Sequence, residues 1–404
     1  MIKIHTYENH PNGKFIFDRY LYLAALVLPF SPHDVLGKDQ LKIDGKVVTA
    51  DNFLEISSKK PRARRENYKN LMEKYELRDY SKDRTEQFKE DELLAAKVIY
   101  NDDRMLYDYL YVDSSIENPV LNREKLRKLM TVKMDELDDE LNKLKENVIS
   151  KKNELLNVVF RYHAFSGNPE AIKLLKAMDI FVCPYCNRQY TFTVSDKNGT
   201  SRAQFDHYLP KDKYPFFAVS LFNLVPCCGL CNLAKGDKED FLYPYSEEMG
   251  NDVRFETKYL SDFRYLVGNK NAINGFDIKL NIVGNDLKDV YKKKVKKSIE
   301  CLHLETLYNE HRDYILDLFQ TNYIYSDAYV DILCRQFPDI FPSQNEVKKM
   351  MYLMNIDKEH WGERTLGKLT HDMDLELTSH KESVPDSMES NKIMGVSEWL
   401  WTGI

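Results

Sequence analysis

Hydrophobic residues recur at helical spacing over most of the chain. An apolar run from Tyr20 to Phe30 (YLYLAALVLPF) predicts a buried core helix that ends at Pro29, since a bilayer span needs about 20 residues. Residues 66–112 also have a helical pattern. Between Asn122 and Phe160, apolar residues recur at mostly three- and four-residue steps with Lys and Glu between them. This pattern predicts one long amphipathic helix, or two in tandem, packed within the chain or docked on a partner.

Shorter segments have the alternation and the turn residues that are typical of strands. We expect strands in MIKIHTY at the N-terminus, in a hairpin over 41–48, in 188–194 and 202–205 on either side of a turn at Asn198-Gly199, and in VRFETKYL, FRYLVG and FDIKL after residue 250. Residues 285–362 return to helical spacing. The predicted fold class is therefore α+β, predominantly helical, with a small strand-containing module at the centre.

These patterns predict three domains. Residues 1–165 form a mostly helical N-terminal domain, 166–250 a compact central module, and 251–404 a mixed, then helical, C-terminal domain with a mobile tail. Asn168 and Pro169 suit the cap and the first position of a helix that leads into the central module. The chain ends in VSEWLWTGI, whose two tryptophans we expect to pack on the body or on a partner subunit.

Composition narrows the functional classes. The 404 residues have a net charge of -6, so no overall basic field favours nucleic acid, although local patches decide phosphate binding. Two such patches, 59–65 and 292–297, are basic and are either solvated faces or phosphate-binding surfaces. The sequence contains no GxxxxGK[ST] loop and no HExxH motif. It also has no apolar signal segment, so we expect a soluble, cytoplasmic protein without membrane contact.

Five of the seven cysteines lie between residues 183 and 231. Two Cys-x-x-Cys pairs, Cys183/Cys186 and Cys228/Cys231, have the spacing of zinc knuckles, and four thiolates around one ion make a closed, structural Zn²⁺ site. Cys227 lacks this spacing relative to Cys231, and we expect it to lie outside the site. Disulfides are the alternative, but such clustering favours metal ligation in a reducing compartment.

Polar residues between and after these knuckles suggest phosphodiester chemistry. Asp206 and Asn232 offer oxygen donors of the kind that Mg²⁺ or Mn²⁺ prefers. His207 follows Asp206 and would point to the opposite side of the strand, where a neutral imidazole can act as a general base. Asn223 is placed to orient the histidine loop by side-chain hydrogen bonds.

Two lysines near these residues are candidates for phosphate binding. Lys235 falls in the helix that we expect to begin at Asn232, and Lys211 follows in the sequence FDHYLPK. Solvated lysines are the alternative for both.

The combination CPYC, FDHYLPK, NLVPCCGLCN and KGD resembles the HNH (ββα-metal) endonuclease family in its zinc-stapled form. The resemblance covers about 60 residues and implies a central HNH module. It also implies that Asp206 and Asn232 bind the catalytic metal, that His207 is the base and that Asn223 is structural. The family more often has His than Asn at the last position. The phrases also resemble HNH nuclease subunits that accompany ATPases in Septu-type bacterial anti-phage systems, which suggests a partner ATPase. We expect double-stranded DNA as the nucleic acid, and we expect the partner to gate the enzyme, because an unregulated nuclease would be toxic to its host.

Another class of function remains open from the sequence. A zinc-ribbon module that binds RNA would share the cysteine pairs, with Asp206-His207 incidental. A nuclease toxin that cleaves RNA or tRNA would share the whole motif. Metal-dependent cleavage that is lost on substitution of His207 favours a nuclease over the binding module, and the nucleic acid that is cleaved distinguishes a DNA endonuclease from an RNA-cleaving toxin.

Overall fold

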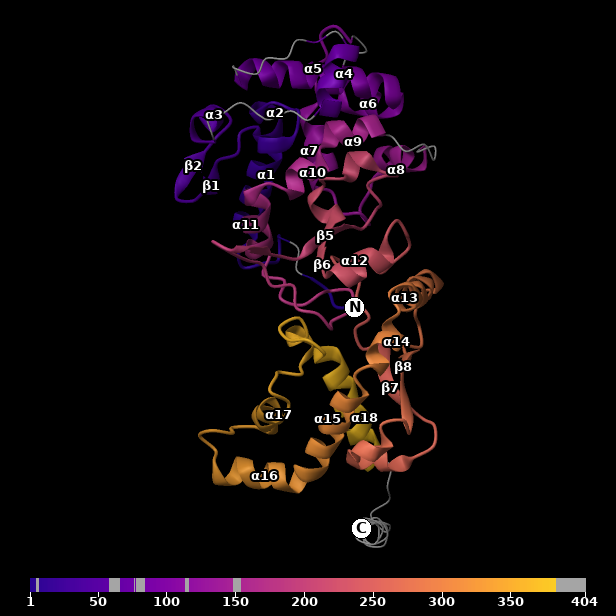
Figure 1. Ribbon diagram of the computed structural model, residues 1–404. Coiled ribbons are helices and arrows are strands. Elements are labelled where there is room, and N and C mark those ends of the chain that lie inside the picture. The colour runs from indigo at the N-terminus through magenta and orange to yellow at the C-terminus, as the bar shows by residue number, and fades with distance from the viewer. Residues whose placement is uncertain are drawn as a thin grey trace. The chain divides into compact units, whose positions relative to one another are not determined.

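The computed structural model describes residues 1–4, 7–57, 66–75, 77, 84–112, 116–147 and 154–382 (Figure 1). The described residues are about 52% helical with small antiparallel sheets, which confirms the α+β class. It divides into two compact units, one of residues 1–185 and 189–248, the other of 186–188 and 249–404. The first unit thus includes most of the two predicted N-terminal domains. The basic stretch 59–65, the polar residues after 382 and the tryptophan tail lie outside the described residues.

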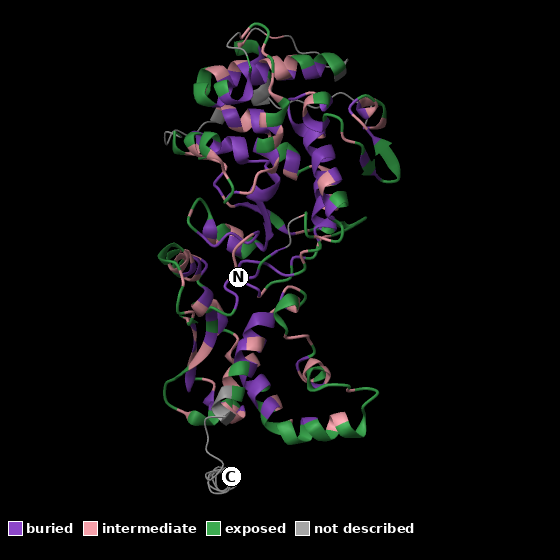
Figure 2. Ribbon diagram, turned by 180° about the vertical axis from the view of Figure 1, so that it is seen from behind, coloured by how far each residue is buried: buried purple, intermediate pink, exposed green. Residues whose placement is uncertain are grey.

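Helices make up most of the first unit. They are α1 (Gly13–Val27), α2 (Pro32–Leu36), α3 (Phe53–Ile56), α4 (Glu66–Lys74), α5 (Arg84–Asp102), α6 (Arg104–Leu110), α7 (Arg123–Thr131), α8 (Asp139–Glu146), α9 (Glu154–Phe160), α10 (Tyr162–Ser166), α11 (Pro169–Ala177) and α12 (Gly229–Lys235). The predicted core helix is α1, in which Tyr20, Leu21 and Leu23 are completely buried. Figure 2 colours the buried residues purple along the ribbon. Asn168 caps α11 through its side chain and Pro169 occupies the first turn, as predicted.

The prediction of one long helix between 122 and 160 was wrong, because α7 ends at Thr131 and α8 begins only at Asp139. Residues 148–153, between α8 and α9, lie outside the described residues, so the alternative of two helices in tandem stays a prediction. Helix α7 ends where Val132 adopts an extended conformation. Asp138 then caps α8 by accepting a hydrogen bond from the backbone N–H of Leu141, and it also pairs with Lys128. Asp side chains that compete for backbone donors favour helix starts over helix interiors, and this local effect interrupts the apolar periodicity.

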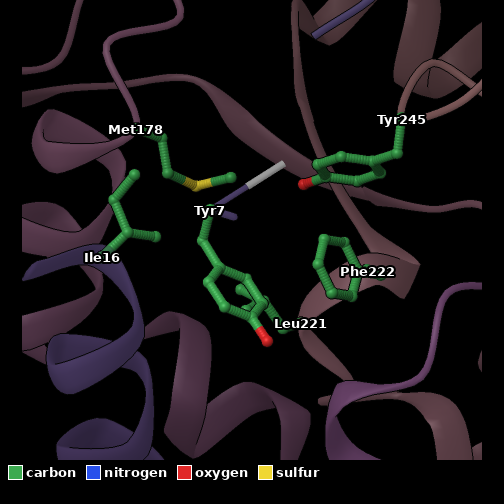
Figure 3. A pocket seen from close by; sticks show the side chains of 6 residues that line it. All are labelled: Tyr7, Ile16, Met178, Leu221, Phe222 and Tyr245. Atoms are coloured by element: carbon green, nitrogen blue, oxygen red, sulfur yellow. The ribbon is translucent and has the colours of Figure 1, made fainter. Parts of the chain in front are cut away.

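The N-terminal segment forms no strand in its described residues, contrary to the prediction. Ile2 and Ile4 instead donate single backbone hydrogen bonds to the carbonyls of Pro184 and Pro244. Just beyond, Gly13 begins α1 so close to Tyr7 that a Cβ at residue 13 would lie 1.6 Å from the Tyr7 carbonyl oxygen. The helix therefore requires glycine here. A void of about 10 Å³ lies beside this turn, and Figure 3 shows its lining of aromatic and aliphatic side chains.

Six short strands pair in the first unit. They are β1 (Leu41–Ile43) with β2 (Lys46–Val48), β3 (Val194–Asp196) with β4 (Gly199–Ser201), and β5 (Gln204–His207) with β6 (Leu224–Cys227), all antiparallel. The hairpin around Asp44-Gly45 and the turn at Asn198-Gly199 are confirmed. The central module differs from the prediction, since 188–194 is not a strand paired with 202–205. Strand β5 pairs with β6 instead, and α12 follows directly, which gives the order strand, strand, helix (Figure 1).

The second unit has one antiparallel sheet and a set of helices. Its elements are β7 (Val253–Tyr259), β8 (Phe276–Ile282), α13 (Asp289–Cys301), α14 (Leu304–Asn309), α15 (Arg312–Ile324), α16 (Asp327–Gln336), α17 (Gln344–Tyr352) and α18 (Gly367–Glu382). The strand predicted at FRYLVG was wrong, because Phe263–Val267 is a 3₁₀ helix. Helix α13 carries the lysines of the second basic patch. Among the described residues, no helix combines the length and the apolar character that a membrane crossing requires.

Candidate active site and metal centre

Four cysteines form the one group of three or more His, Cys, Asp or Glu side chains in the described residues that is arranged to hold a metal ion. The Sγ atoms of Cys183, Cys186, Cys228 and Cys231 all lie within 4.8 Å of one another, and all four residues are buried. Sulfur atoms about 2.3 Å from a tetrahedral Zn²⁺ would be about 3.8 Å apart, so the four cysteines fit such an ion. This cluster could hold a metal such as zinc, as the knuckle spacing predicted.

Local backbone structure prepares these sulfur atoms for a metal. The backbone N–H of Arg188 donates to Cys186 Sγ, and that of Cys231 donates to Cys228 Sγ, each at 3.4 Å. Cys228 is also the N-cap of α12. Hydrogen-bond donors and a helix N-terminus favour the thiolate form that binds metal. Cys227 is buried at the end of β6 and is not in the cluster, as expected, and none of the seven cysteines forms a disulfide.

One face of β5 packs against α12 through polar contacts. Because side chains alternate along a strand, Gln204 and Asp206 share this face. Asn232 Nδ2 donates to Gln204 Oε1 at 2.7 Å. One turn further along α12, Lys235 Nζ lies 3.3 Å from Asp206 Oδ2 and donates to the His207 carbonyl oxygen at 2.6 Å. The two predicted metal ligands thus lie on contacting elements, but the amide of Asn232 hydrogen-bonds to Gln204 and the carboxylate of Asp206 pairs with Lys235.

Asp206 is almost completely enclosed, with 2% of its surface exposed. Tyr185, the third residue of the first knuckle, donates its hydroxyl to Asp206 Oδ2 at 2.6 Å. Burial raises the pKa of Asp206, and the Lys235 ammonium and the Tyr185 hydroxyl oppose that rise. As placed, these side chains do not fit a hydrated Mg²⁺. The ammonium of Lys235 lies against the Asp206 carboxylate on the side that faces α12, where the cation would have to sit between Asp206 and Asn232.

His207 points to the opposite face of β5, as the alternation predicts. Its ring packs edge-on against Tyr162, with 4.2 Å between centroids, and its Nε2 lies 2.9 Å from the carbonyl oxygen of Ala218. Since a carbonyl only accepts, Nε2 carries the hydrogen and Nδ1 has the free lone pair. Burial lowers the pKa of His207 to about 3, so the imidazole is neutral at physiological pH.

Asn223 holds the loop between β5 and β6. Its Oδ1 accepts from the backbone N–H of Leu209 at 2.7 Å, and its Nδ2 donates to the carbonyls of Leu209 at 3.1 Å and Phe217 at 2.9 Å. The side chain is completely buried. These three bonds determine the path of the loop, and Ala218, which accepts from His207, follows Phe217 directly. Asn223 therefore positions the histidine through the backbone, in the manner expected for it.

The two candidate phosphate-binding lysines have different environments. Lys235 is completely buried and engaged with Asp206, so its ammonium is not exposed to a phosphate, contrary to the expectation. It ends α12, which begins at Gly229 and not at Asn232 as predicted. Lys211 has a side chain that is 30% exposed and lies 3.4 Å from Asp212. Of the two, Lys211 alone is accessible.

Several residues at the site were not identified from the sequence. Tyr185 lies between the two cysteines of the first knuckle, and Tyr162 is distant in the chain from His207. Gln204 shares a strand face with Asp206 by simple alternation, a signal that was available. The chain matches no protein-family model, no curated protein and no solved structure.

Proposed function

We propose that this chain is a metal-dependent endonuclease of the HNH type that hydrolyses phosphodiester bonds of DNA. One observation carries the proposal: β5, β6 and α12 follow one another as strand, strand and helix, with Asp206-His207 at the end of the first strand. The four-cysteine cluster lies at the start of that helix, and Asn223 clamps the loop between the strands. Together these features support an HNH module more strongly than any one of them does alone.

His207 is the candidate general base, but burial lowers its pKa to about 3, well below the value near 7 that suits a base at physiological pH, so the proposed role requires the site to open to solvent. The imidazole is neutral at physiological pH, its Nε2 is anchored by Ala218, and its Nδ1 is the atom left to take a proton. In the proposed reaction, water loses a proton to Nδ1 and its oxygen bonds to phosphorus. The bond from phosphorus to the 3′ oxygen breaks, and that oxygen takes up a proton. The product carries a 5′-phosphate, because the bond to the 3′ oxygen is the one that breaks.

The proposal includes a divalent cation, Mg²⁺ or Mn²⁺, with Asp206 and Asn232 as its protein ligands. When bound, such an ion neutralises charge on the phosphate. Asp206 pairs with Lys235 in this structure, so the site would have to open before the cation enters. The proposal further includes a partner ATPase that gates the enzyme, which the resemblance to nuclease subunits that accompany ATPases suggests.

Supercoiled plasmid provides a direct test. Purified protein is incubated with plasmid and Mg²⁺ or Mn²⁺, beside His207→Ala and the control His33→Ala, which changes an exposed histidine on α2. We expect nicking by the wild type and the control and none by His207→Ala. Binding of nucleic acid without cleavage under all conditions, including added host lysate as a source of partner, contradicts the nuclease and favours the zinc-ribbon module. Cleavage of tRNA but not plasmid favours the RNA-directed alternative.

A further inference from the structure

A groove of about 460 Å³ lies beside the start of β5. It is lined by residues that include Tyr162, Thr200, Ser201, Arg202, Gln204 and Asn232, and its lining contains no Asp or Glu. The groove therefore offers hydroxyl and amide groups around a single positive charge. Such a lining suits an anion and not a cation.

Arg202 carries the charge of this groove and has a vacant donor. Its Nη1 is shielded from solvent and has no hydrogen-bond partner, and no carboxylate pairs with Arg202 among the described residues. A buried donor without a partner is destabilising, and more so on a charged group. Because Arg202 lines the groove, a turn of its guanidinium would present Nη1 to a ligand there, and a phosphate offers several oxygens in the geometry that arginine binds bidentately.

The groove adjoins the candidate active site. Tyr162 lines it, and the same ring packs against His207 with 4.2 Å between centroids. Asn232 also lines it. Gln204 lies three residues before His207 on β5, a separation of about 10 Å along a strand. The phosphates of one DNA strand are spaced by about 3.4 Å along the helix axis, so the groove lies within a few nucleotides of His207.

We propose that this groove binds a backbone phosphate of the polynucleotide substrate, with Arg202 as its principal contact and the hydroxyls of Thr200 and Ser201 as further donors. The inference rests on the proposed function in that the phosphate belongs to nucleic acid, and it adds a substrate-positioning residue that the HNH motif does not contain. Arg202 acts on binding, whereas His207 acts on cleavage.

Fluorescence anisotropy of a labelled 20-base-pair duplex, measured without divalent cation so that no cleavage occurs, tests the groove. We expect Arg202→Gln to weaken binding about tenfold and to reduce the slope of log K against log salt by about 0.9, as the loss of one phosphate contact requires. Arg202→Lys should recover part of the affinity. The control Lys197→Gln removes one exposed charge from the turn between β3 and β4 and should change binding less than twofold.

A second variant keeps the test independent of folding. Ser201→Asp introduces a carboxylate at an exposed position in the groove and should weaken duplex binding while leaving the melting temperature unchanged. Binding by Arg202→Gln or Ser201→Asp within twofold of the wild type overturns the inference, and so does a wild type that binds no duplex. If the variants weaken binding but the wild type never cleaves, the groove stands and the nuclease fails. If the wild type cleaves and Arg202→Gln binds normally, the nuclease stands and the groove proposal fails.

Discussion

The ammonium of Lys235 lies 3.3 Å from the carboxylate of Asp206, and 0% and 3% of these two side chains are exposed. Both charges are removed from water, so each depends on the other, and the Tyr185 hydroxyl completes the shell around Asp206. A buried pair of this kind contributes little over an apolar pair, but removing one partner leaves an uncompensated charge. The pair therefore links the stability of the segment formed by β5, β6 and α12 to the accessibility of the Asp206 carboxylate for a ligand.

Lys235→Met should destabilise the protein by about 3–5 kcal/mol, because Asp206 would then be buried without its cation. Chemical denaturation followed by circular dichroism measures the change. The double variant Lys235→Met with Asp206→Asn should recover a large part of the loss, since the amide carries no charge. Lys238→Met, which changes an exposed lysine just after α12, is the matched control and should have little effect. Equal stability of Lys235→Met and wild type would contradict the buried pair.

Metal analysis should find one zinc ion per chain. Cys231→Ser should lose it and should melt at a lower temperature, because the cluster then lacks one of four ligands. Cys227→Ser is a close control, since Cys227 is also buried but lies outside the cluster, and it should retain the metal. Mass spectrometry under native conditions gives the stoichiometry. Zinc that is retained by Cys231→Ser and lost by Cys227→Ser would require a different ligand set.

Asn223→Ala should release the loop between β5 and β6. Three hydrogen bonds to the backbone of Leu209 and Phe217 disappear, and buried groups are left unsatisfied, for a loss of about 3 kcal/mol or more. Trypsin should then cleave after Lys211 or Lys213 faster than in the wild type, which peptide mass mapping detects. Asn198→Ala, in the exposed turn between β3 and β4, should leave this cleavage rate unchanged. No increase in loop cleavage would show that Asn223 does not hold the loop.

Glu92 on α5 should make stability depend on pH. Burial, and secondly the nearby Asp34, raises the pKa of Glu92 to about 7. The folded state therefore binds more protons than the unfolded state between about pH 4.5 and 7, and stability falls as the pH rises through this range. Glu92→Gln can still accept from the Ser31 backbone N–H, as Glu92 does, and carries no charge. Its melting temperature relative to wild type should rise from pH 5 to pH 8.

The exposed variant Glu55→Gln, on α3, is the control for this pH series and should show no such trend. A constant difference between Glu92→Gln and wild type at all pH values would mean that Glu92 does not titrate in this range.

Local chemistry in the sequence was enough to predict several features. Cys-x-x-Cys spacing specified the four cysteines that cluster and excluded Cys227, because a knuckle needs two intervening residues. Asp44-Gly45, Asn198-Gly199 and Asn168-Pro169 specified two turns and a helix start, since each depends on the backbone preferences of adjacent residues. Alternation placed Asp206 and His207 on opposite faces of one strand.

Only the tertiary structure decided which segments pair and which charges are buried. Strand β5 pairs with β6, from which sixteen residues separate it, and not with the nearer segment 188–194. All four residues of β6 are buried, whereas most of 188–194 is exposed, so the pairing follows burial and not proximity in the chain. Lys235 has no sequence signature that separates a solvated lysine from a buried one. Its position on the last turn of α12, directly over Asp206, makes it part of the core, and that depends on how helix and strand pack. The packing of α12 on β5 cannot be inferred from the order of the residues alone.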